Sequence, residues 1–426
     1  MARVSTADLI ESGVLEIGDG YRAKNSELAP TGIPFARAQN LNNGFDFTGA
    51  DRYPVEALGR VGSKVSQPGD CVLTSKGSVG RVGYVGRDTP RFVYSPQLSY
   101  WRSLAPAVIE PLYLRYWLLG PEFGLQRDAV KGSTDMADYV NLRDQRRMSI
   151  TLPPIQSQRK IAAILSAYDD LIENNDRRIK LLEEMAQRIY REWFVDFRYP
   201  GHENVPLVDS EQGRIPQGWA VSTLGNVCAR ITDGAHNSPA TTKTGMPMAS
   251  VKDMTPRSLE LSTCRLIAEE DYDALVRQDC RPWSGDVLVS KDGANFLKHV
   301  FPMFEDSVAV ILSSIAVLRP SDAISPILLA LTIREPENKA RLKGFVSGAA
   351  IPRVVLRDFK LHRLVVPLRD TQERFNQTCV DVMRQAVALE SLNRRLRATR
   401  DLLLPRLISG EIEVSDLAIA IPAAAA

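Results

Sequence analysis

The sequence predicts a mixed α/β protein in which two similar globular modules are joined by an antiparallel two-helix coiled coil, with a pseudo-two-fold relation between the copies. Three observations predict this fold. Short motifs recur in the same order at an offset close to 214 residues. Two heptad patterns of apolar residues recur at that offset, one after each module. Within the modules, short apolar runs alternate with Gly, Pro and Asp turns, as is typical of strands and short helices.

The internal repeat rests on several short matches. Pro68-Gly-Asp70 corresponds to Ser284-Gly-Asp286, and Leu142-Arg-Asp144 corresponds to Leu356-Arg-Asp358. Each match alone could arise by chance between glycine-rich turns. Their common order and nearly constant offset over more than 100 residues instead favour two copies of one unit.

These patterns divide the chain into five segments. The first module is 1–151, the first helix 152–198, the second module 199–366, the second helix 367–412, and an alanine-rich tail, expected to be disordered, 413–426. Within the modules we expect strands at 71–74, 82–85, 287–290 and 308–318, and helices at 111–119 and 327–333.

The two helices carry matching heptad seams. The first seam consists of Ile161, Leu165, Tyr168, Ile172, Asn175, Ile179, Leu182, Ala186, Ile189 and Trp193. Adding 214 to each number gives Phe375, Cys379, Val382, Ala386, Leu389, Asn393, Leu396, Arg400, Leu403 and Leu407. One such stripe could equally be an amphipathic helix packed on its own module, but two stripes at equivalent positions favour pairing with each other. Arg400 is a poor core residue, and Pro405 should end or kink the second helix near its tail.

A register for the helix pair follows from the repeat. If the numbers of paired residues sum to 568, every seam position meets a seam position. Ile161 then faces Leu407, and Trp193 faces Phe375. Asn175 meets Asn393 near the middle, where a buried polar pair can fix the register at some cost in stability.

Composition excludes several classes of protein. The net charge is only +2, with 53 Lys and Arg against 51 Asp and Glu, so bulk charge does not indicate nucleic acid. The five cysteines are scattered without a C-x-x-C pair, which favours reduced thiols in a cytoplasm over a zinc site or disulfides. We expect a cytoplasmic protein, because no apolar run is long enough to span a membrane and the first residues do not form a secretory signal.

Two segments resemble a known family. Leu152-Pro-Pro-Ile-Gln-Ser-Gln-Arg-Lys-Ile-Ala-Ala-Ile-Leu165, with the helix that ends at Trp193-Phe-Val-Asp-Phe197, resembles the central conserved region of Type I restriction–modification specificity subunits. Val366-Pro-Leu368, Gln372-Glu-Arg-Phe375 and Leu403-Leu-Pro-Arg-Leu-Ile-Ser-Gly-Glu-Ile412 are similar to the distal conserved region. The resemblance covers almost the whole chain, and the modules match only in outline.

The resemblance implies a non-catalytic subunit that reads DNA. Each module would be a target recognition domain for one half of a bipartite, asymmetric site on double-stranded DNA, and the helices would set the distance between the halves. The implied partners are two methyltransferase subunits, which use S-adenosylmethionine, and restriction/translocase subunits, which use ATP and Mg. No cofactor and no metal is expected on this chain itself.

Candidate DNA contacts lie in glycine-rich, basic loops, because glycine lets backbone N–H groups approach phosphates and Lys, Arg, Ser and Asn supply hydrogen bonds. A solvated tight turn with ordinary surface charges is the alternative for each loop. The candidates are Lys76, Ser78 and Arg81, then Lys131, Ser133 and Thr134, and in the second module Lys291, Asn295 and Lys298.

The sequence contains no recognisable motif for ATP binding, methyl transfer or metal binding. The chain has no Walker A sequence, no Asn/Asp-Pro-Pro-Tyr/Phe methyltransferase motif and no histidine–cysteine pair at ligand spacing. Trp193, Phe194 and Phe197 are interpreted as a packing cluster rather than a base-stacking site. Two alternatives stay open: a stand-alone modification enzyme with built-in recognition domains, and a coiled-coil adaptor that does not bind DNA.

Overall fold

A computed structural model describes residues 2–42, 44–130, 132–134, 137–291, 296–344 and 356–421. The chain divides into two compact units, which are described one at a time. Unit 1 comprises residues 1–173 and 394–426, and unit 2 comprises residues 174–393. Each unit therefore holds one globular head and one stretch of each long helix, α5 (Ile155–Tyr190) and α11 (Arg369–Ile408).

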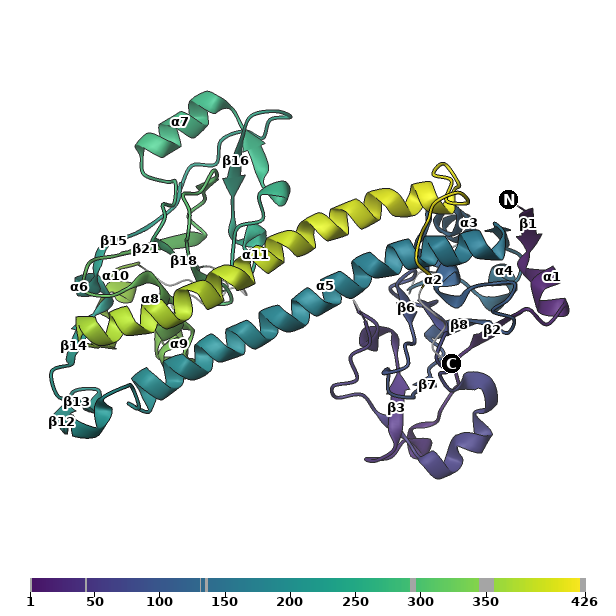
Figure 1. Cartoon of the computed structure of the whole chain (residues 1–426), viewed down its shortest axis with the longest axis horizontal. Coiled ribbons are helices and arrows are strands. Elements are labelled where there is room, and N and C mark those ends of the chain that lie inside the picture. The colour runs from purple at the N-terminus through teal and green to yellow at the C-terminus, as the bar shows by residue number, and fades with distance from the viewer. Residues whose placement is uncertain are drawn as a thin grey trace. The chain divides into compact units, whose positions relative to one another are not determined.

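The head of unit 1 has two lobes (Figure 1). Its proximal lobe is the four-stranded sheet β2-β8-β5-β6, and its distal lobe is the three-stranded sheet β4-β3-β7. Strand β1 pairs with β11 and so closes the head where α5 begins. The elements are β1 (Ala2–Ser5), α1 (Thr6–Glu11), β2 (Leu15–Asp19), β3 (Ile33–Ala36), β4 (Arg52–Tyr53), β5 (Cys71–Thr74), β6 (Val82–Tyr84), β7 (Val93–Tyr94), β8 (Leu98–Ser103), α2 (Pro111–Leu119), α3 (Pro121–Val130), β9 (Gly132–Thr134), β10 (Ala137–Tyr139), α4 (Leu142–Gln145) and β11 (Ser149–Leu152).

The head of unit 2 repeats this plan. Its proximal sheet is β15-β21-β18-β19, its distal sheet is β17-β16-β20, and β14 pairs with β22 where α11 begins. The elements are β12 (Leu207–Ser210), β13 (Gly213–Pro216), β14 (Ala220–Thr223), α6 (Leu224–Val227), β15 (Cys228–Asp233), β16 (Met246–Ala249), β17 (Arg265–Ile267), α7 (Glu269–Arg277), β18 (Val287–Ser290), β19 (Val300–Pro302), β20 (Val310–Ile311), β21 (Ile315–Pro320), α8 (Pro326–Arg334), α9 (Pro336–Lys343), α10 (Leu356–Leu361) and β22 (Arg363–Val366).

The predicted duplication is thus confirmed in both sheets of each head and in the strand pair that precedes each long helix. Strands β5 and β18 and helix α2 have the predicted bounds, and α8 extends the predicted helix by one residue at each end. The strand expected over 308–318 is instead two strands, β20 and β21, because Ile315 N donates to Leu312 O and the chain turns there. In each head the backbone passes so close to one glycine that no side chain would fit there. A Cβ on Gly20 would lie 1.9 Å from Ser95 O, and one on Gly234 would lie 2.1 Å from Ile311 O.

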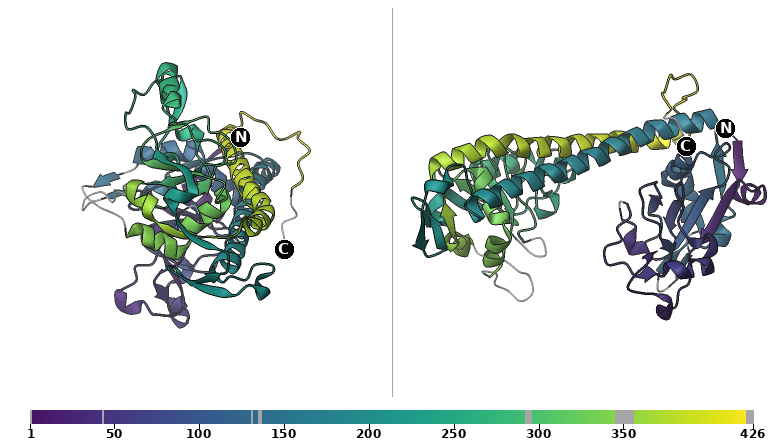
Figure 2. Two further views of the ribbon diagram at one scale, coloured as in Figure 1. Left: turned by 90° about the vertical axis from the view of Figure 1, so that its left-hand side faces the viewer. Right: turned by 60° about the horizontal axis from the view of Figure 1, so that its bottom comes forward.

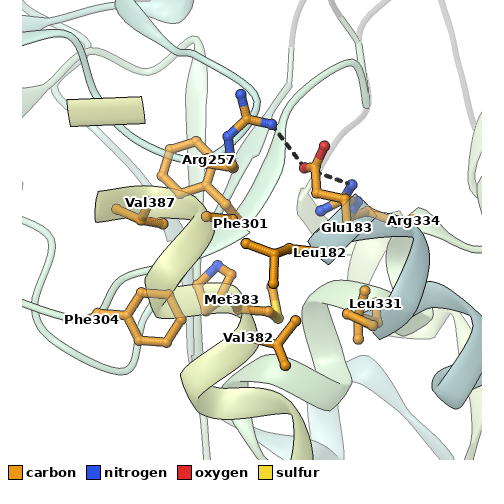
Figure 3. A pocket seen from close by; sticks show the side chains of 13 residues that line it. Leu182, Glu183, Arg257, Phe301, Phe304, Leu331, Arg334, Val382, Met383 and Val387 are labelled. Carbon is orange, nitrogen blue, oxygen red and sulfur yellow. Dashed lines mark hydrogen bonds and ion pairs between the residues drawn. The ribbon is translucent and has the colours of Figure 1, made fainter. Parts of the chain in front are cut away.

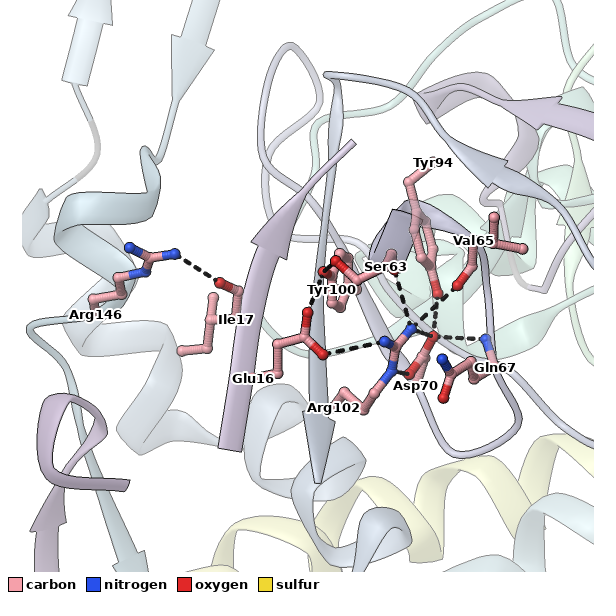
Figure 4. A network of polar contacts seen from close by, with 10 residues as sticks. All are labelled: Glu16, Ile17, Ser63, Val65, Gln67, Asp70, Tyr94, Tyr100, Arg102 and Arg146. Carbon is pink, nitrogen blue, oxygen red and sulfur yellow. Dashed lines mark hydrogen bonds and ion pairs between the residues drawn. The ribbon is translucent and has the colours of Figure 1, made fainter. Parts of the chain in front are cut away.

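The repeated Gly-Asp motif has a structural purpose. In unit 1, Asp70 is fully buried and accepts two hydrogen bonds from Arg102, Nε at 2.6 Å and Nη2 at 2.8 Å, and one from Gln67 N at 2.8 Å (Figure 4). Burial disfavours the Arg102 charge, but the hydrogen bonds that Arg102 donates to Asp70, with the negative charges of Asp70 and Glu16, outweigh this effect and raise the pKa of the guanidinium.

The same arrangement occurs in unit 2. Asp286 accepts from Arg319 Nε at 2.8 Å and Nη2 at 2.9 Å, and from Trp283 N at 2.8 Å. In each proximal sheet, a two-bond arginine–carboxylate pair therefore joins an arginine of one strand, β8 or β21, to the turn before the neighbouring strand, β5 or β18. The motif that revealed the repeat is an internal anchor of the head.

A second duplicated anchor attaches each head to its helix. Near the start of α5, Gln158 accepts from Glu110 N and donates to the carbonyl oxygens of Val108 and Pro153. Near the start of α11, Gln372 accepts from Ser325 N and donates to the carbonyls of Ala323 and Pro367. Because these glutamines are 214 residues apart and almost fully buried, each helix leaves its head in the same way.

In unit 2 the helices pair in the predicted register. Asn175 Nδ2 donates to Asn393 Oδ1 at 2.8 Å, and both side chains are buried. The rings of Trp193 and Phe375 lie 5.8 Å apart. Because the C-terminal part of α5 meets the N-terminal part of α11 here, the pairing is antiparallel (Figure 2).

In unit 1 the N-terminal part of α5 pairs with the C-terminal part of α11. Ile161, Leu165 and Leu407 are buried in one core with the proximal lobe. Arg400, the poor core residue of the heptad pattern, is accommodated by an ion pair, since its Nη1 lies 2.6 Å from Asp169 Oδ1. Every predicted seam side chain is buried or half-buried: Ile161, Leu165, Tyr168, Ile172, Asn175, Ile179, Leu182, Ala186, Ile189, Trp193, Phe375, Cys379, Val382, Ala386, Leu389, Asn393, Leu396, Arg400, Leu403 and Leu407.

Pro405 does not end helix α11 at once, since the helix continues to Ile408. One expectation near the chain's end is corrected. The tail was expected to be disordered from residue 413, but Val414 is buried in the core of unit 1 and Lys160 Nζ donates to Ser415 O at 2.6 Å. Val414 therefore packs against the core of unit 1, whereas residues 415–418, 420 and 421 are exposed; residues 422–426 lie outside the described residues.

The predicted aromatic cluster is confirmed in unit 2. Phe194 packs edge-on against Phe375 at 4.8 Å and lies 5.8 Å from Trp219, and Phe197 also contacts Trp219. These rings close the end of α5 onto the second head, and a short π-helix over 191–195 turns the chain there.

We predict that Asp70→Asn destabilises unit 1 by about 1–3 kcal/mol, because the Arg102 guanidinium loses its two-bond carboxylate partner and keeps only Glu16, whose side chain is 30% exposed. Asp286→Asn should cost unit 2 less, since the Arg319 side chain is 30% exposed. Urea-dependent hydrogen exchange resolved by peptide measures each unit separately. Asp88→Asn, at an exposed position, is the control, and equal stability of D70N and the native protein would contradict the anchor.

We also predict that Asn393→Leu alone destabilises the helix pair by about 1–3 kcal/mol, because Asn175 loses its buried partner. The double variant Asn175→Leu/Asn393→Leu should regain that loss, since an apolar pair replaces a polar one. Urea unfolding of both variants, with the exposed Asn174→Leu as the control, measures this. A double variant less stable than either single variant would show that the asparagines do not interact.

Candidate nucleic-acid interface

The loop between β5 and β6 in unit 1 presents two polar side chains to solvent. Thr74 closes the loop: its Oγ1 donates to Ser78 O at 2.5 Å and accepts from Arg81 N at 2.9 Å. Lys76 and Ser78 are exposed at the tip. The backbone of the loop is therefore held while these two side chains are available to a ligand.

A second candidate segment lies beside this loop. The hairpin of β9 and β10 contains Ser133 and Thr134, and Lys76 forms a backbone bridge with Tyr139 of β10. Gly77 N also donates to Asp138 O at 3.0 Å. Two sequence-predicted loops about 55 residues apart are thus brought together at one edge of the head.

Part of that hairpin is outside the description. Lys131 lies outside the described residues, and so do the side chains of Ser133 and Thr134. Sequence reasoning missed Tyr139, whose side chain is 39% exposed next to Lys76. An exposed aromatic ring beside a lysine can contact a base or sugar, but only the β10 pairing, which has no sequence signal, puts it there.

Arg81 is used inside the head. Its Nη1 donates to the carbonyl oxygens of Leu41 at 3.0 Å and Ala38 at 3.3 Å. The guanidinium therefore links the proximal lobe to the start of the distal lobe, and a DNA contact by the same group would compete with these bonds.

Lys291 requires a correction. It occupies the position of Lys76 in the repeat, but it is buried and its ammonium pairs with Asp233. In unit 1 the equivalent carboxylate, Asp19, is already paired with Lys64 at 2.7 Å, which leaves Lys76 free to point outward. The charge of Lys291 is neutralised inside the head, so it is an internal ion pair and not a phosphate contact.

The rest of the β18–β19 loop retains one exposed cation. Lys298 is exposed, whereas Asn295 lies outside the described residues. The neighbouring His299 is buried, and desolvation together with the Lys298 charge lowers the pKa of its imidazole. His299 is therefore neutral near pH 7, and Lys298 supplies the positive charge of the loop.

No alternative reactive centre is evident in the described part of the chain. Burial raises the pKa of all five cysteine thiols, to about 12 for Cys228, Cys264 and Cys379. Thiolate chemistry is therefore disfavoured at neutral pH. Among the described residues, no group of three or more His, Cys, Asp or Glu side chains could hold a metal, and no helix is long and apolar enough to cross a bilayer.

Comparison with known proteins agrees with this architecture. The family model of the Type I restriction modification DNA specificity domain matches residues 11–184, which include most of the first head and α5. The Type I restriction enzyme MjaIX specificity subunit of Methanocaldococcus jannaschii is 25% identical over 285 residues, 64% of this chain and 62% of that protein. The chain is thus similar to Type I restriction enzyme specificity subunits.

Two further relatives extend the likeness along the chain. The HindI specificity subunit of Haemophilus influenzae is 23% identical over 391 residues, which are 78% of this chain and 84% of that subunit. The crystal structure of the Type-I restriction-modification S subunit from M. genitalium has 13% identity, a TM-score of 0.61 and 95% coverage of both chains. The likeness to the latter shows a shared fold. The aligned region spans less than two thirds of the MjaIX subunit, whereas it covers most of the HindI subunit.

Proposed function

We propose that this chain selects a bipartite, asymmetric DNA sequence for a Type I restriction–modification complex and performs no chemistry itself. The observation that carries the proposal is the pair of heads with one scaffold and different loops. The anchors Asp70–Arg102 and Asp286–Arg319 are shared, whereas Lys76 is exposed and its counterpart Lys291 is buried. Equal scaffolds with unequal surfaces suit two half-sites of different sequence.

The helix pair would set the gap between the half-sites. At about 1.5 Å per residue, the 36 residues of α5 give a helix of roughly 54 Å. A reader that contacts DNA at two places needs its heads at multiples of roughly one helical turn, about 34 Å. A seam in a single register makes that separation reproducible.

Partner subunits would dock on the outer faces of the helices. Leu181 and Leu402 are 64% and 71% exposed, and Leu171 and Met185 are about half exposed. Apolar side chains that the seam does not use are typical of a protein interface. We assign these faces to two methyltransferase subunits that carry S-adenosylmethionine, with restriction/translocase subunits supplying ATP and Mg²⁺ chemistry, all in the cytoplasm.

Two other functions predict different results. A stand-alone modification enzyme would need its own catalytic group, and a coiled-coil adaptor would not need two heads with distinct polar loops. Purified full-length chain with labelled S-adenosylmethionine and DNA tests the first: methyl transfer without a partner would contradict our proposal. Failure of the chain with its methyltransferase partner to protect any DNA would favour the adaptor.

The direct test of the function is a methylome. Deleting the chain should abolish methylation of one bipartite motif. Replacing residues 1–151 with the head of another specificity subunit should change one half of that motif only. A motif that survives deletion, or changes in both halves, would refute the assignment.

We predict that Lys76→Gln and Lys298→Gln each weaken DNA binding by the complex about equally for all sequences, because each removes a phosphate contact. The slope of log affinity against log salt should fall by about one for each lysine. Binding titrations at several salt concentrations measure the slope. Lys180→Gln, a 79% exposed lysine on α5, is the control, and unchanged slopes for K76Q and K298Q would remove these loops from the interface.

A further inference from the structure

A turn of the second head reaches both long helices within unit 2. Thr255-Pro-Arg-Ser258 is a tight turn in which Thr255 N donates to Ser258 O at 2.9 Å. The residues on either side, Met254 and Leu259, are buried in one core with Phe301 of β19. The turn is therefore mounted firmly on the head, and its side chains extend toward the helices.

Arg257 of this turn joins the two helices to the head. Its Nη1 lies 2.9 Å from Glu183 Oε1 on α5 (Figure 3), and its Nη2 lies 2.8 Å from Glu390 Oε1 on α11. Glu390 also accepts from Thr255 Oγ1 at 3.1 Å and Ser258 Oγ at 2.8 Å. One guanidinium can bridge these carboxylates only when α5 and α11 are in the register that places both beside the turn.

Apolar packing at this junction is incomplete. A cavity of about 20 Å³ lies beneath Arg257, lined by Leu182, Ala186, Phe301, Leu331 and Met383 among others. Arg334 of α8 approaches Glu183 at 3.5 Å at its rim. The polar contacts of the turn therefore lie beside a small gap in the apolar core that joins the head to the helices.

The equivalent junction of unit 1 is built with other residues. There Asp169 of α5 accepts from Arg400 of α11 at 2.6 Å, and from Tyr116 at 2.8 Å and Arg115 at 3.1 Å on the head. The repeat equates Asp169, Arg400 and Tyr116 with three residues that line the cavity, namely Met383, Ala186 and Leu331. Unit 2 thus lacks the carboxylate-centred clamp of unit 1 and has the Arg257 turn beside the space where that clamp would be.

We propose that the Thr255–Ser258 turn is a latch, with Arg257 as a positioning residue that fixes the second head on the helix pair and so sets the gap at which the second half-site is read. The inference rests on the proposed DNA-reading function. The side chains of Arg257, Glu390 and Glu183 are 16%, 12% and 28% exposed, so solvent screens these pairs less than it screens surface ion pairs. Breaking the latch frees the head to tilt, which admits DNA with a gap one base pair longer or shorter.

The test uses the full-length chain expressed with its methyltransferase partner in cells that carry a DNA library. The library holds both half-sites with the native gap, or with a gap changed by one base pair. The ratio of methylation at native and altered gaps is the readout, because general loss of stability or affinity lowers both values and leaves the ratio unchanged.

Arg257→Gln should lower this ratio by at least about fivefold, the effect of losing part of one charge-assisted attachment. Glu390→Gln keeps the Arg257–Glu183 pair and is the milder second variant should R257Q fold poorly; it should lower the ratio less. Arg257→Lys keeps the charge but cannot bridge both carboxylates, so it should fall between R257Q and the native chain. Arg277→Gln, an exposed arginine of α7 in the same head, is the matched control and should leave the ratio unchanged.

A native ratio in folded R257Q and E390Q would overturn the latch and leave the proposed function intact. A lowered methylation ratio in R277Q as well would also overturn the latch, since the effect would not be specific to the turn. Absence of site-specific methylation with the native chain would instead refute the proposed function.

Discussion

The register of the α5–α11 seam is the constraint on which the other features depend. It brings Asn175 to Asn393, Trp193 to Phe375, and Arg400 within reach of Asp169. A slip by one heptad would bury one asparagine against an apolar residue and leave Arg400 without its carboxylate. The polar positions of the seam therefore select one alignment, whereas the apolar positions supply most of the stability.

A comparison of the two heads distinguishes residues that recur in both from loops that differ. The Asp–Arg anchors, the Gln158 and Gln372 caps and the closely packed Gly20 and Gly234 recur in both units because each head must fold and leave its helix in the same way. The β5–β6 loop of unit 1 and the β18–β19 loop of unit 2 differ in the side chains that they expose. Such loops can change without disturbing the anchors, so the two heads can share one scaffold and still present different surfaces.

The helix pair could be predicted from the sequence in detail because a heptad seam is one-dimensional: spacing alone fixes which residues face each other. The heads were predictable only in outline. Lys291 matched Lys76 in sequence, but its burial depends on the ion pair with Asp233, whereas in unit 1 the equivalent Asp19 pairs with Lys64. Tyr139 and the tail residue Val414 were missed for a similar reason, since contacts between distant segments place them.

The central claim is that the helix pair determines the spacing of two half-sites, and the most direct measurement is a methylome after lengthening both helices. One heptad inserted after Glu173 and another before Arg394 keeps the seam pattern and adds about 10 Å of helix, which is about three base pairs of DNA. The account predicts a methylated motif with both half-sites unchanged and a gap altered by about three base pairs. An unchanged gap in a folded, active complex would contradict it.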